Sequence, residues 1–243
     1  MHDRFTRRSM LGLLSAVPLS AALTGCDQAL DSLDSGARDA NAADAAHADS
    51  GALDAGTIDA GALDAGAECV ATESDALGPF FEEGSPSRAQ IAALEEPGDR
   101  LFVAGRLGSV GACTALAGYT IDIWQADENG DYHDASEDFR LRGRVTTDPE
   151  GRFAFETIMP GRYATAAGLR PAHLHVRAYS PGGLTLVTTQ LYFAGDPFLG
   201  TEDGCQPPTC FSGDLARTLS LRPATMEGRA GMAGEVELFV PIG

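Results

Sequence analysis

The chain has 243 residues, and its 35 acidic side chains against 17 basic ones give a formal net charge of −18 and an isoelectric point near 4.4. This acidity, without any basic stripe, excludes the electrostatic pattern of a nucleic-acid-binding protein.

Residues 1–26 are typical of an export signal. Arg7 and Arg8 lie in a charged region of twin-arginine type, and residues 10–23 are apolar but too few to remain as a membrane-spanning helix. The small residues before Cys26 resemble a lipoprotein cleavage box, which would leave a lipid on Cys26. An ordinary secretory signal with an incidental cysteine is the alternative. We therefore expect an exported, membrane-anchored lipoprotein, periplasmic or at the cell surface.

Residues 27–68 are expected to be a disordered acidic tether. They contain repeats of Asp-Ala-Gly type and no aromatic residue, so they offer little to bury. Ten acidic residues against Arg38 give this stretch a net charge of −9 (1 − 10), half of the total for the chain. A flexible coil of this length would span roughly 35 Å on average.

The remaining cysteines are expected to form disulfides in an oxidising compartment, where four cysteines allow three connectivities. Cys205 and Cys210 bracket a short, proline-containing loop, so we pair them, which leaves Cys69 with Cys113. A metal site built from these thiols is the competing interpretation, but their spacing is not that of a zinc site.

Residues 69–243 are expected to form one all-β domain. Alternating apolar residues and turn signals favour a β-sandwich or barrel. Strands are predicted at 101–107, 119–124, 152–156, 172–176, 184–193, 215–221 and 236–240, with a tight turn at 148–151. Only residues 87–94 suggest a short helix.

Four side chains form a candidate metal site. His173 and His175 point to the same face of a strand because side chains alternate with a period of two. Tyr132 and Tyr163 each follow a turn that contains glycine. Two imidazoles with two phenolates favour a hard ion of high charge such as Fe(III).

Other interpretations of these residues are weaker. Most isolated histidine pairs on a strand are surface or core residues. A cupin site would need a glutamate where Tyr179 stands, and residues 127–131 lack the glycine position and closing glutamate of a calcium loop.

Several ordered motifs together resemble the intradiol ring-cleavage dioxygenases, over about residues 72–197. They are found at residues 78–81, 123–132, 143–148, 160–163, 170–175 and 189–193. The resemblance implies a β-sandwich enzyme with non-haem Fe(III) that cleaves a catechol-type diol between its hydroxyl-bearing carbons, using O2 and giving a muconate-type product.

The resemblance also implies a role for each site residue. Tyr132 matches a permanent tyrosinate ligand, and Tyr163 matches an axial tyrosinate that leaves when the diol binds. His173 and His175 match the imidazole ligands. Arg170 matches a catalytic arginine beside the iron, and Gln190 matches a polar residue of the pocket.

Two features distinguish this chain within that resemblance. Phe81 stands where many relatives carry tyrosine, and a signal and tether replace the N-terminal helical dimerisation segment of the catechol-cleaving branch. The sequence leaves the identity of the diol and the oligomeric state open. A catalytically inactive cell-surface lipoprotein that binds an aromatic or glycan ligand is the alternative function, although such a binder would be expected to have lost one of the four ligands.

Overall fold

The computed structural model describes residues 69–133 and 138–242, so the predicted signal, the tether and the lipidation of Cys26 lie outside the described residues. None of the helices in this part of the chain is long and apolar enough to cross a bilayer.

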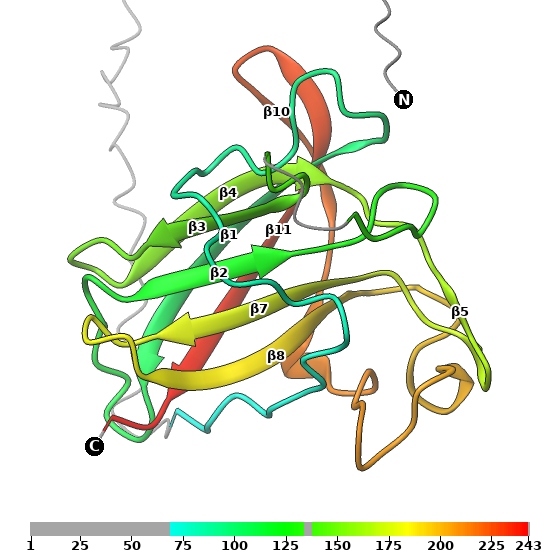
Figure 1. Cartoon of the computed structure of the whole chain (residues 1–243). Helices are drawn as coiled ribbons and strands as arrows, with labels where there is room; N and C mark the ends of the chain where they lie inside the picture. Colours follow the sequence, from blue (N-terminus) through cyan, green and yellow to red (C-terminus); the bar gives the residue numbers. More distant parts are fainter. Residues whose placement is uncertain (1–68, 134–137, 243) are drawn as a thin grey trace, which may run out of the picture. The chain divides into compact units, whose positions relative to one another are not determined.

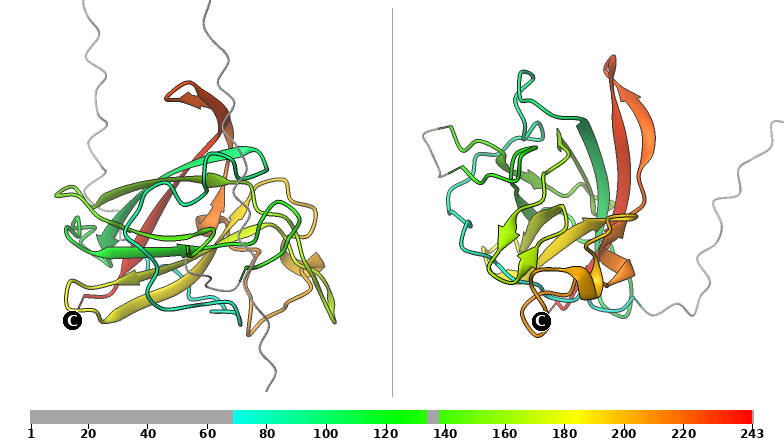
Figure 2. Two further views of the ribbon diagram at one scale, coloured as in Figure 1. Left: turned by 45° about the horizontal axis from the view of Figure 1, so that its top comes forward. Right: turned by 90° about the vertical axis from the view of Figure 1, so that its right-hand side faces the viewer.

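Two packed β-sheets form the described domain, which confirms the all-β prediction and selects the sandwich (Figures 1 and 2). The first sheet has the order β10-β11-β1-β4 and the second has the order β3-β2-β7-β8-β9. The strands are β1 (Arg100–Ser109), β2 (Thr120–Trp124), β3 (Arg142–Thr146), β4 (Arg152–Ile158), β7 (His173–Tyr179), β8 (Thr185–Phe193), β9 (Thr218–Leu219), β10 (Arg222–Met226) and β11 (Arg229–Val240). A small ribbon pairs β5 (Ala164–Thr165) with β6 (Gly168–Leu169).

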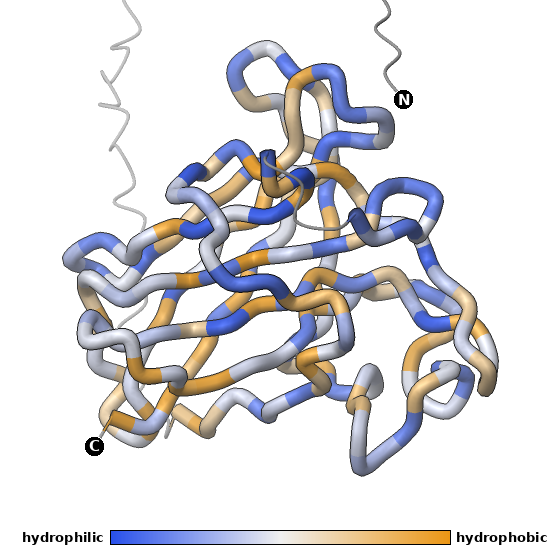
Figure 3. Tube along the Cα trace, viewed as in Figure 1, coloured by the Kyte–Doolittle hydropathy of each residue, from blue (hydrophilic) through white to orange (hydrophobic). Residues whose placement is uncertain are grey.

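The core lies between the facing sides of the two sheets. Leu101 and Phe153 of the first sheet and Ile121, Leu174 and Val176 of the second belong to one buried apolar cluster. Hydrophilic and hydrophobic residues are interspersed along the strands (Figure 3), and buried residues recur at every second position along β4 and the end of β11, as expected where one face of a sheet is packed on the core. Leu174 and Val176 therefore turn His173 and His175 to the outer face of the second sheet.

That outer face is covered by the segment that precedes β1, which crosses it as irregular chain (Figure 1). The backbone N–H of Asp75 donates to the Thr188 carbonyl over 2.9 Å, and that of Arg88 donates to the Arg144 carbonyl over 3.0 Å. This cover explains why β7 is buried on both faces and why the histidines are shielded from water.

Several details differ from the sequence-based prediction, in which β3 was not among the strands. Residues 87–94 form no helix, because their N–H groups bond to β3 and β4, with isolated bridges from Ser87 and Gln90. The predicted strand at 215–221 is mostly absent: Leu215–Arg217 is a 3-10 helix whose first turn is capped by the Asp214 side chain, and only Thr218–Leu219 is strand.

The strand predicted at 236–240 is longer than expected. It begins at Arg229 because a hairpin turn at Glu227 and Gly228, both with positive φ, pairs it with β10. The sequence-based prediction did not include β10. Its Pro223 argues against a strand in general, but β10 is an edge strand, and an edge strand tolerates proline.

Both predicted disulfides are present. Cys69 is bonded to Cys113, and Cys205 is bonded to Cys210. The competing interpretation, a metal site made of these thiols, is therefore wrong.

Candidate metal centre

Strand register gathers the first site residues on one face of the second sheet. His175 lies opposite Trp124 on β2 and Gln190 on β8, and His173 lies opposite Tyr192. Directly opposite residues share a face, so the five side chains are neighbours. The indole of Trp124 stacks on the His175 ring, with centroids 4.7 Å apart and an angle of 9° between the planes.

The two tyrosines are brought together by two turns that touch through their backbones. The N–H of Gly161 donates to the Asp127 carbonyl over 2.7 Å. A Cβ on Gly161 would collide with the backbone of Asn129 and Gly130, and a Cβ on Gly130 would collide with the carbonyl of Arg162. Only glycine at both positions permits this approach, which places Tyr132 and Tyr163 with ring centroids 5.7 Å apart.

All four predicted ligands converge. The hydroxyl oxygen of Tyr132 lies 3.0 Å from Nε2 of His175 and 3.4 Å from Nε2 of His173. The ring of Tyr163 lies 5.6 Å from that of His173, centroid to centroid, and the two imidazoles are 4.9 Å apart. The structure thus brings together four residues that are separated by up to 43 positions in the sequence.

The protonation states of the histidines suit metal ligation. Burial lowers the pKa of His173 to about 4, helped by the charge of Arg170, and it also lowers the pKa of His175 well below its ordinary value. Both imidazoles are therefore neutral at pH 7. Nδ1 of His173 lies 2.7 Å from the Pro171 carbonyl and donates to it, so the lone pair is on Nε2, which faces Tyr132.

The Tyr132 phenol requires a nearby cation in order to ionise. Burial raises the pKa of Tyr132 above its ordinary value, and the neighbouring Tyr163 raises it further. An ion of high charge among the four donors would reverse this shift, because a bound cation dominates the local electrostatics. The donor set thus fits a hard metal ion held by neutral imidazoles and phenolates.

Two residues that build the site, Phe80 and Arg142, were given no role by the sequence analysis. Phe80 stacks on Tyr132 with centroids 4.1 Å apart and packs edge-on against Tyr163. The buried Arg142 donates from Nη1 to the Phe80 carbonyl over 2.6 Å and from Nη2 to the His133 carbonyl over 2.8 Å. Arg142 therefore holds the backbone at Phe80 and at His133, the residue after Tyr132, and so supports both rings of the stack. A buried arginine on a strand has no local sequence pattern that reveals such partners.

Arg170 and Gln190, both predicted, lie together in a buried polar network next to the four donors. Nη2 of Arg170 donates to Oε1 of Gln190 over 3.0 Å, and Nε donates to Oδ1 of Asp203 over 3.0 Å. The amide of Gln190 donates to the Ala76 carbonyl over 2.7 Å. The Tyr192 hydroxyl donates to Gln190, and its ring lies 6.0 Å from that of His173.

Comparison with known proteins agrees with this geometry. The sequence profile of the dioxygenase family matches residues 77–207, more than half of the chain. The chain is 34% identical over 155 residues to a chlorocatechol 1,2-dioxygenase of Rhodococcus opacus and 32% identical over 153 residues to a hydroxyquinol 1,2-dioxygenase of a Rhizobium species. These matches cover 54% of this chain, and 60% and 51% of the relatives.

Solved structures give the same result. The dioxygenase domain of a dioxygenase carbohydrate-binding protein fusion from a cellulolytic Streptomyces superposes with a TM-score of 0.58 at 32% identity, covering 72% of this chain and 100% of that one. A 3-chlorocatechol 1,2-dioxygenase of Rhodococcus opacus gives a TM-score of 0.61 at 26% identity, with 71% and 73% covered.

The chain belongs to the intradiol dioxygenase family. It spans only about half to three-fifths of the length of the curated relatives it matches.

In this family member, the four-donor cluster is the candidate metal centre. Among residues 69–133 and 138–242, no group of three or more His, Cys, Asp or Glu side chains is placed to hold a metal ion. A groove of about 1530 Å³ lies elsewhere, between the segment from Cys69 to Glu73, the loop around Phe211 and β11, and it contains none of the four donors.

Proposed function

We propose that this protein is a non-haem Fe(III) dioxygenase that cleaves a catechol-type aromatic diol between its hydroxyl-bearing carbons. The observation that carries the proposal is the convergence of Tyr132, Tyr163, His173 and His175. Relatives named as catechol, chlorocatechol and hydroxyquinol 1,2-dioxygenases support this substrate class.

The four donors would hold the metal, with His173 and His175 binding through Nε2 and the tyrosines through their phenolate oxygens. When bound, Fe(III) would supply a positive centre that chelates both diol oxygens and withdraws electron density from the ring towards attack by O2. The neighbouring side chains set the rest of the chemistry.

Tyr163 is suited to take up a proton from the incoming diol. It is half-buried, and it comes from a turn followed by the short β5–β6 ribbon, whereas Tyr132 is wedged between both histidines and the ring of Phe80. The Tyr163 side chain can therefore move to accept a proton from the diol with less disruption of its surroundings than Tyr132 would cause. Proton transfer of this kind contributes typically 10²–10⁴-fold to a rate.

Arg170 supplies a permanent positive charge beside the reacting ring. Arg170 is 3% exposed, and its pKa is raised: burial alone would lower the pKa, but the hydrogen bonds and charge of Asp203 outweigh that effect. It would stabilise negative charge that develops on the substrate, in the manner of an oxyanion hole. Phe80 and Trp124 wall the site and exclude water from it.

Oxygen uptake by the purified, iron-loaded protein tests the proposal, measured against catechol, hydroxyquinol, protocatechuate and a lignin-derived diol. We expect stoichiometric uptake with at least one diol, and loss of uptake in Tyr132→Phe. A protein that binds diols without consuming oxygen would instead support the alternative, an inactive aromatic-binding lipoprotein.

Export and membrane attachment through a lipid on Cys26 are further parts of the proposal, supported by the N-terminal sequence pattern. Mass spectrometry of the mature N-terminal peptide tests them. A diacylglyceryl cysteine at position 26 is expected, and a soluble protein that retains an unmodified Cys26 would contradict the anchor.

A further inference from the structure

Asp203 holds one edge of the Arg170 guanidinium. Nε of Arg170 donates to Oδ1 of Asp203 over 3.0 Å, and Nη2 donates to Oδ2 over 3.2 Å. Nη2 also donates to Gln190 and to the Tyr192 hydroxyl, over 3.0 and 3.2 Å. Because these acceptors occupy Nε and Nη2, Nη1 on the opposite edge is the nitrogen left to donate to a bound molecule.

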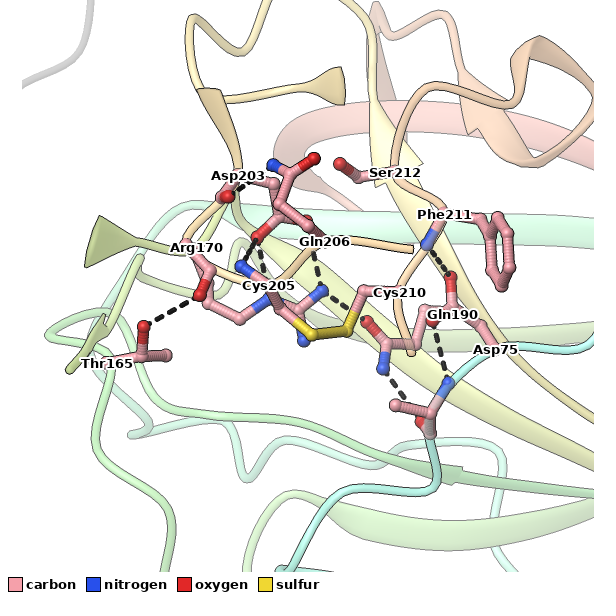
Figure 4. Close-up of a disulfide and its surroundings, with 12 residues drawn as sticks. Asp75, Thr165, Arg170, Gln190, Asp203, Cys205, Gln206, Cys210, Phe211 and Ser212 are labelled. Carbon is pink, nitrogen blue, oxygen red and sulfur yellow. Dashed lines mark hydrogen bonds and ion pairs between the residues drawn. A yellow bond between two sulfur atoms is a disulfide. The ribbon is translucent and has the colours of Figure 1, made fainter. Parts of the chain in front are cut away.

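The position of Asp203 is set by the short loop that the Cys205–Cys210 disulfide closes (Figure 4). Oδ1 of Asp203 accepts a hydrogen bond from the backbone N–H of Cys205 over 2.9 Å, so the first cysteine of the bridge bonds directly to the carboxylate. The side-chain amide of Gln206 donates to the carbonyl of Asp203 over 2.6 Å and to that of Gly200 over 3.1 Å. Gln206, which lies inside the disulfide loop, thus ties down Asp203 and the chain that precedes it.

The same loop is joined to the chain that leads into Arg170. The N–H of Gly204 donates to the Leu169 carbonyl over 2.9 Å, and the Thr165 hydroxyl donates to the Gly204 carbonyl over 2.8 Å. A Cβ on Gly204 would collide with the Gly168 carbonyl. Asp203 and Arg170 are therefore held in register by backbone contacts as well as by their ion pair.

The other disulfide offers a matched comparison. Cys69–Cys113 ties the start of the domain to the β1–β2 connection, where Cys69 also forms an isolated bridge with Gly111. Those segments carry none of the acceptors bonded to Arg170, which are Asp203, Gln190 and Tyr192.

We propose that Asp203 is a positioning residue for Arg170, held in place by the Cys205–Cys210 disulfide, so that turnover depends on this disulfide. The inference rests on the proposed function. With Nε and Nη2 fixed, Nη1 is directed to the diol. When the disulfide is broken, Asp203 loses its anchor and the guanidinium reorients, whereas the four metal donors lie outside the loop and keep their places.

The first test is Asp203→Asn in the iron-loaded full-length chain. We expect kcat to fall about tenfold to a hundredfold, as on loss of one aimed electrostatic contact. Iron content and diol affinity under nitrogen should stay within about twofold of the parent. Asp203 acts on the rate through Arg170 and does not itself bind the metal or the diol. Asp203→Glu should recover part of the rate.

A double-mutant cycle separates positioning from a general structural role. If Asp203 acts through Arg170, Asp203→Asn should cause no further loss of kcat in an Arg170→Lys background. Losses that multiply would overturn the assignment.

The disulfide is tested by comparing Cys205→Ser/Cys210→Ser with the matched control Cys69→Ser/Cys113→Ser. The first variant should lose at least about fivefold in kcat, and the control should not. Equal rates for both would overturn the dependence on the Cys205–Cys210 bridge.

A readout that needs no turnover distinguishes failure of this inference from failure of the proposed function. Phenylglyoxal modifies accessible arginines, and peptide mass spectrometry follows its reaction with Arg170. Arg170 should resist the reagent in the parent and in the Cys69→Ser/Cys113→Ser control. It should react at least about fivefold faster in Asp203→Asn and in Cys205→Ser/Cys210→Ser. If the parent cleaves no diol but this contrast holds, the function is wrong and the positioning stands. If all variants protect Arg170 equally, the positioning is wrong.

Discussion

Gly161→Ala should disrupt the metal centre without altering any donor. The new Cβ would meet the carbonyl oxygen of Glu128 and backbone atoms of Asn129 and Gly130, all within 2.7 Å, whereas real Cβ atoms essentially never come closer than 3.0 Å. Because every atom it meets is backbone, no side chain can rotate to relieve the overlap.

The required displacement is large on the scale of a metal site. Restoring a contact of 3.4 Å with the nearest atom, the Gly130 nitrogen at 2.4 Å, moves the two turns apart by at least 1.0 Å (3.4 − 2.4), whereas metal–ligand distances tolerate only about ±0.2 Å. Iron affinity should therefore fall about tenfold to a hundredfold, the range found when the support of a metal ligand is lost. The overpacking itself should destabilise the fold by about 1–3 kcal/mol.

Iron titration followed by visible absorbance, together with thermal unfolding, measures both effects. A destabilisation of this size lowers Tm by about 2–12 °C in a domain of 150–250 residues. Gly182→Ala is the matched control: its φ also lies outside the left-handed region, and its new Cβ would find only Ser180 Oγ, at 3.8 Å. If Gly161→Ala binds iron and unfolds like the parent, the interlocked turns do not position Tyr132 and Tyr163.

Three further outcomes are expected. Tyr132→Phe should lose most bound iron and its colour, because its oxygen lies between both Nε2 atoms, whereas Tyr163→Phe should keep iron with a shifted visible band; a colourless parent that contains zinc would contradict both. Arg170→Lys should keep iron and bind diol under nitrogen but turn over about tenfold to a thousandfold more slowly, and a parent-like rate or loss of iron would contradict its catalytic role. Asp127 has a lowered pKa: burial alone would raise it, but hydrogen bonds from the Asp131 and Asn129 backbone and from His133 outweigh that effect. The stability it gives is present above its unfolded pKa of about 3.9 and is lost as pH falls through the lower folded value, so the Tm advantage of the parent over Asp127→Asn should be full at about pH 5 and shrink below pH 4; a constant difference would contradict this.

Much of the fold and the four candidate donors could be selected from the sequence because their signals are local. The alternation around His173 and His175 fixed their common face, and the Asn-Gly and Pro-Gly turns fixed where each tyrosine sits. The two disulfides followed from the short loop between Cys205 and Cys210, which left a single pairing for the other two cysteines.

The remaining features depend on contacts between distant segments. Asp203 lies 33 positions after Arg170, and Arg142 lies 62 positions after Phe80, so neither pairing produces a periodic pattern. The helix prediction for residues 87–94 was wrong for the same reason. The N–H groups of this segment bond to acceptors on β3 and β4, which local propensity does not reveal.

Product analysis under ¹⁸O₂ tests the central claim most directly. The iron-loaded protein should convert its diol to a dicarboxylic acid of muconate type that carries one ¹⁸O atom in each new carboxyl group, because the bond between the two hydroxyl-bearing carbons is the one cleaved. A ring-opened product that carries an aldehyde, or an unlabelled product, would contradict intradiol cleavage by this site.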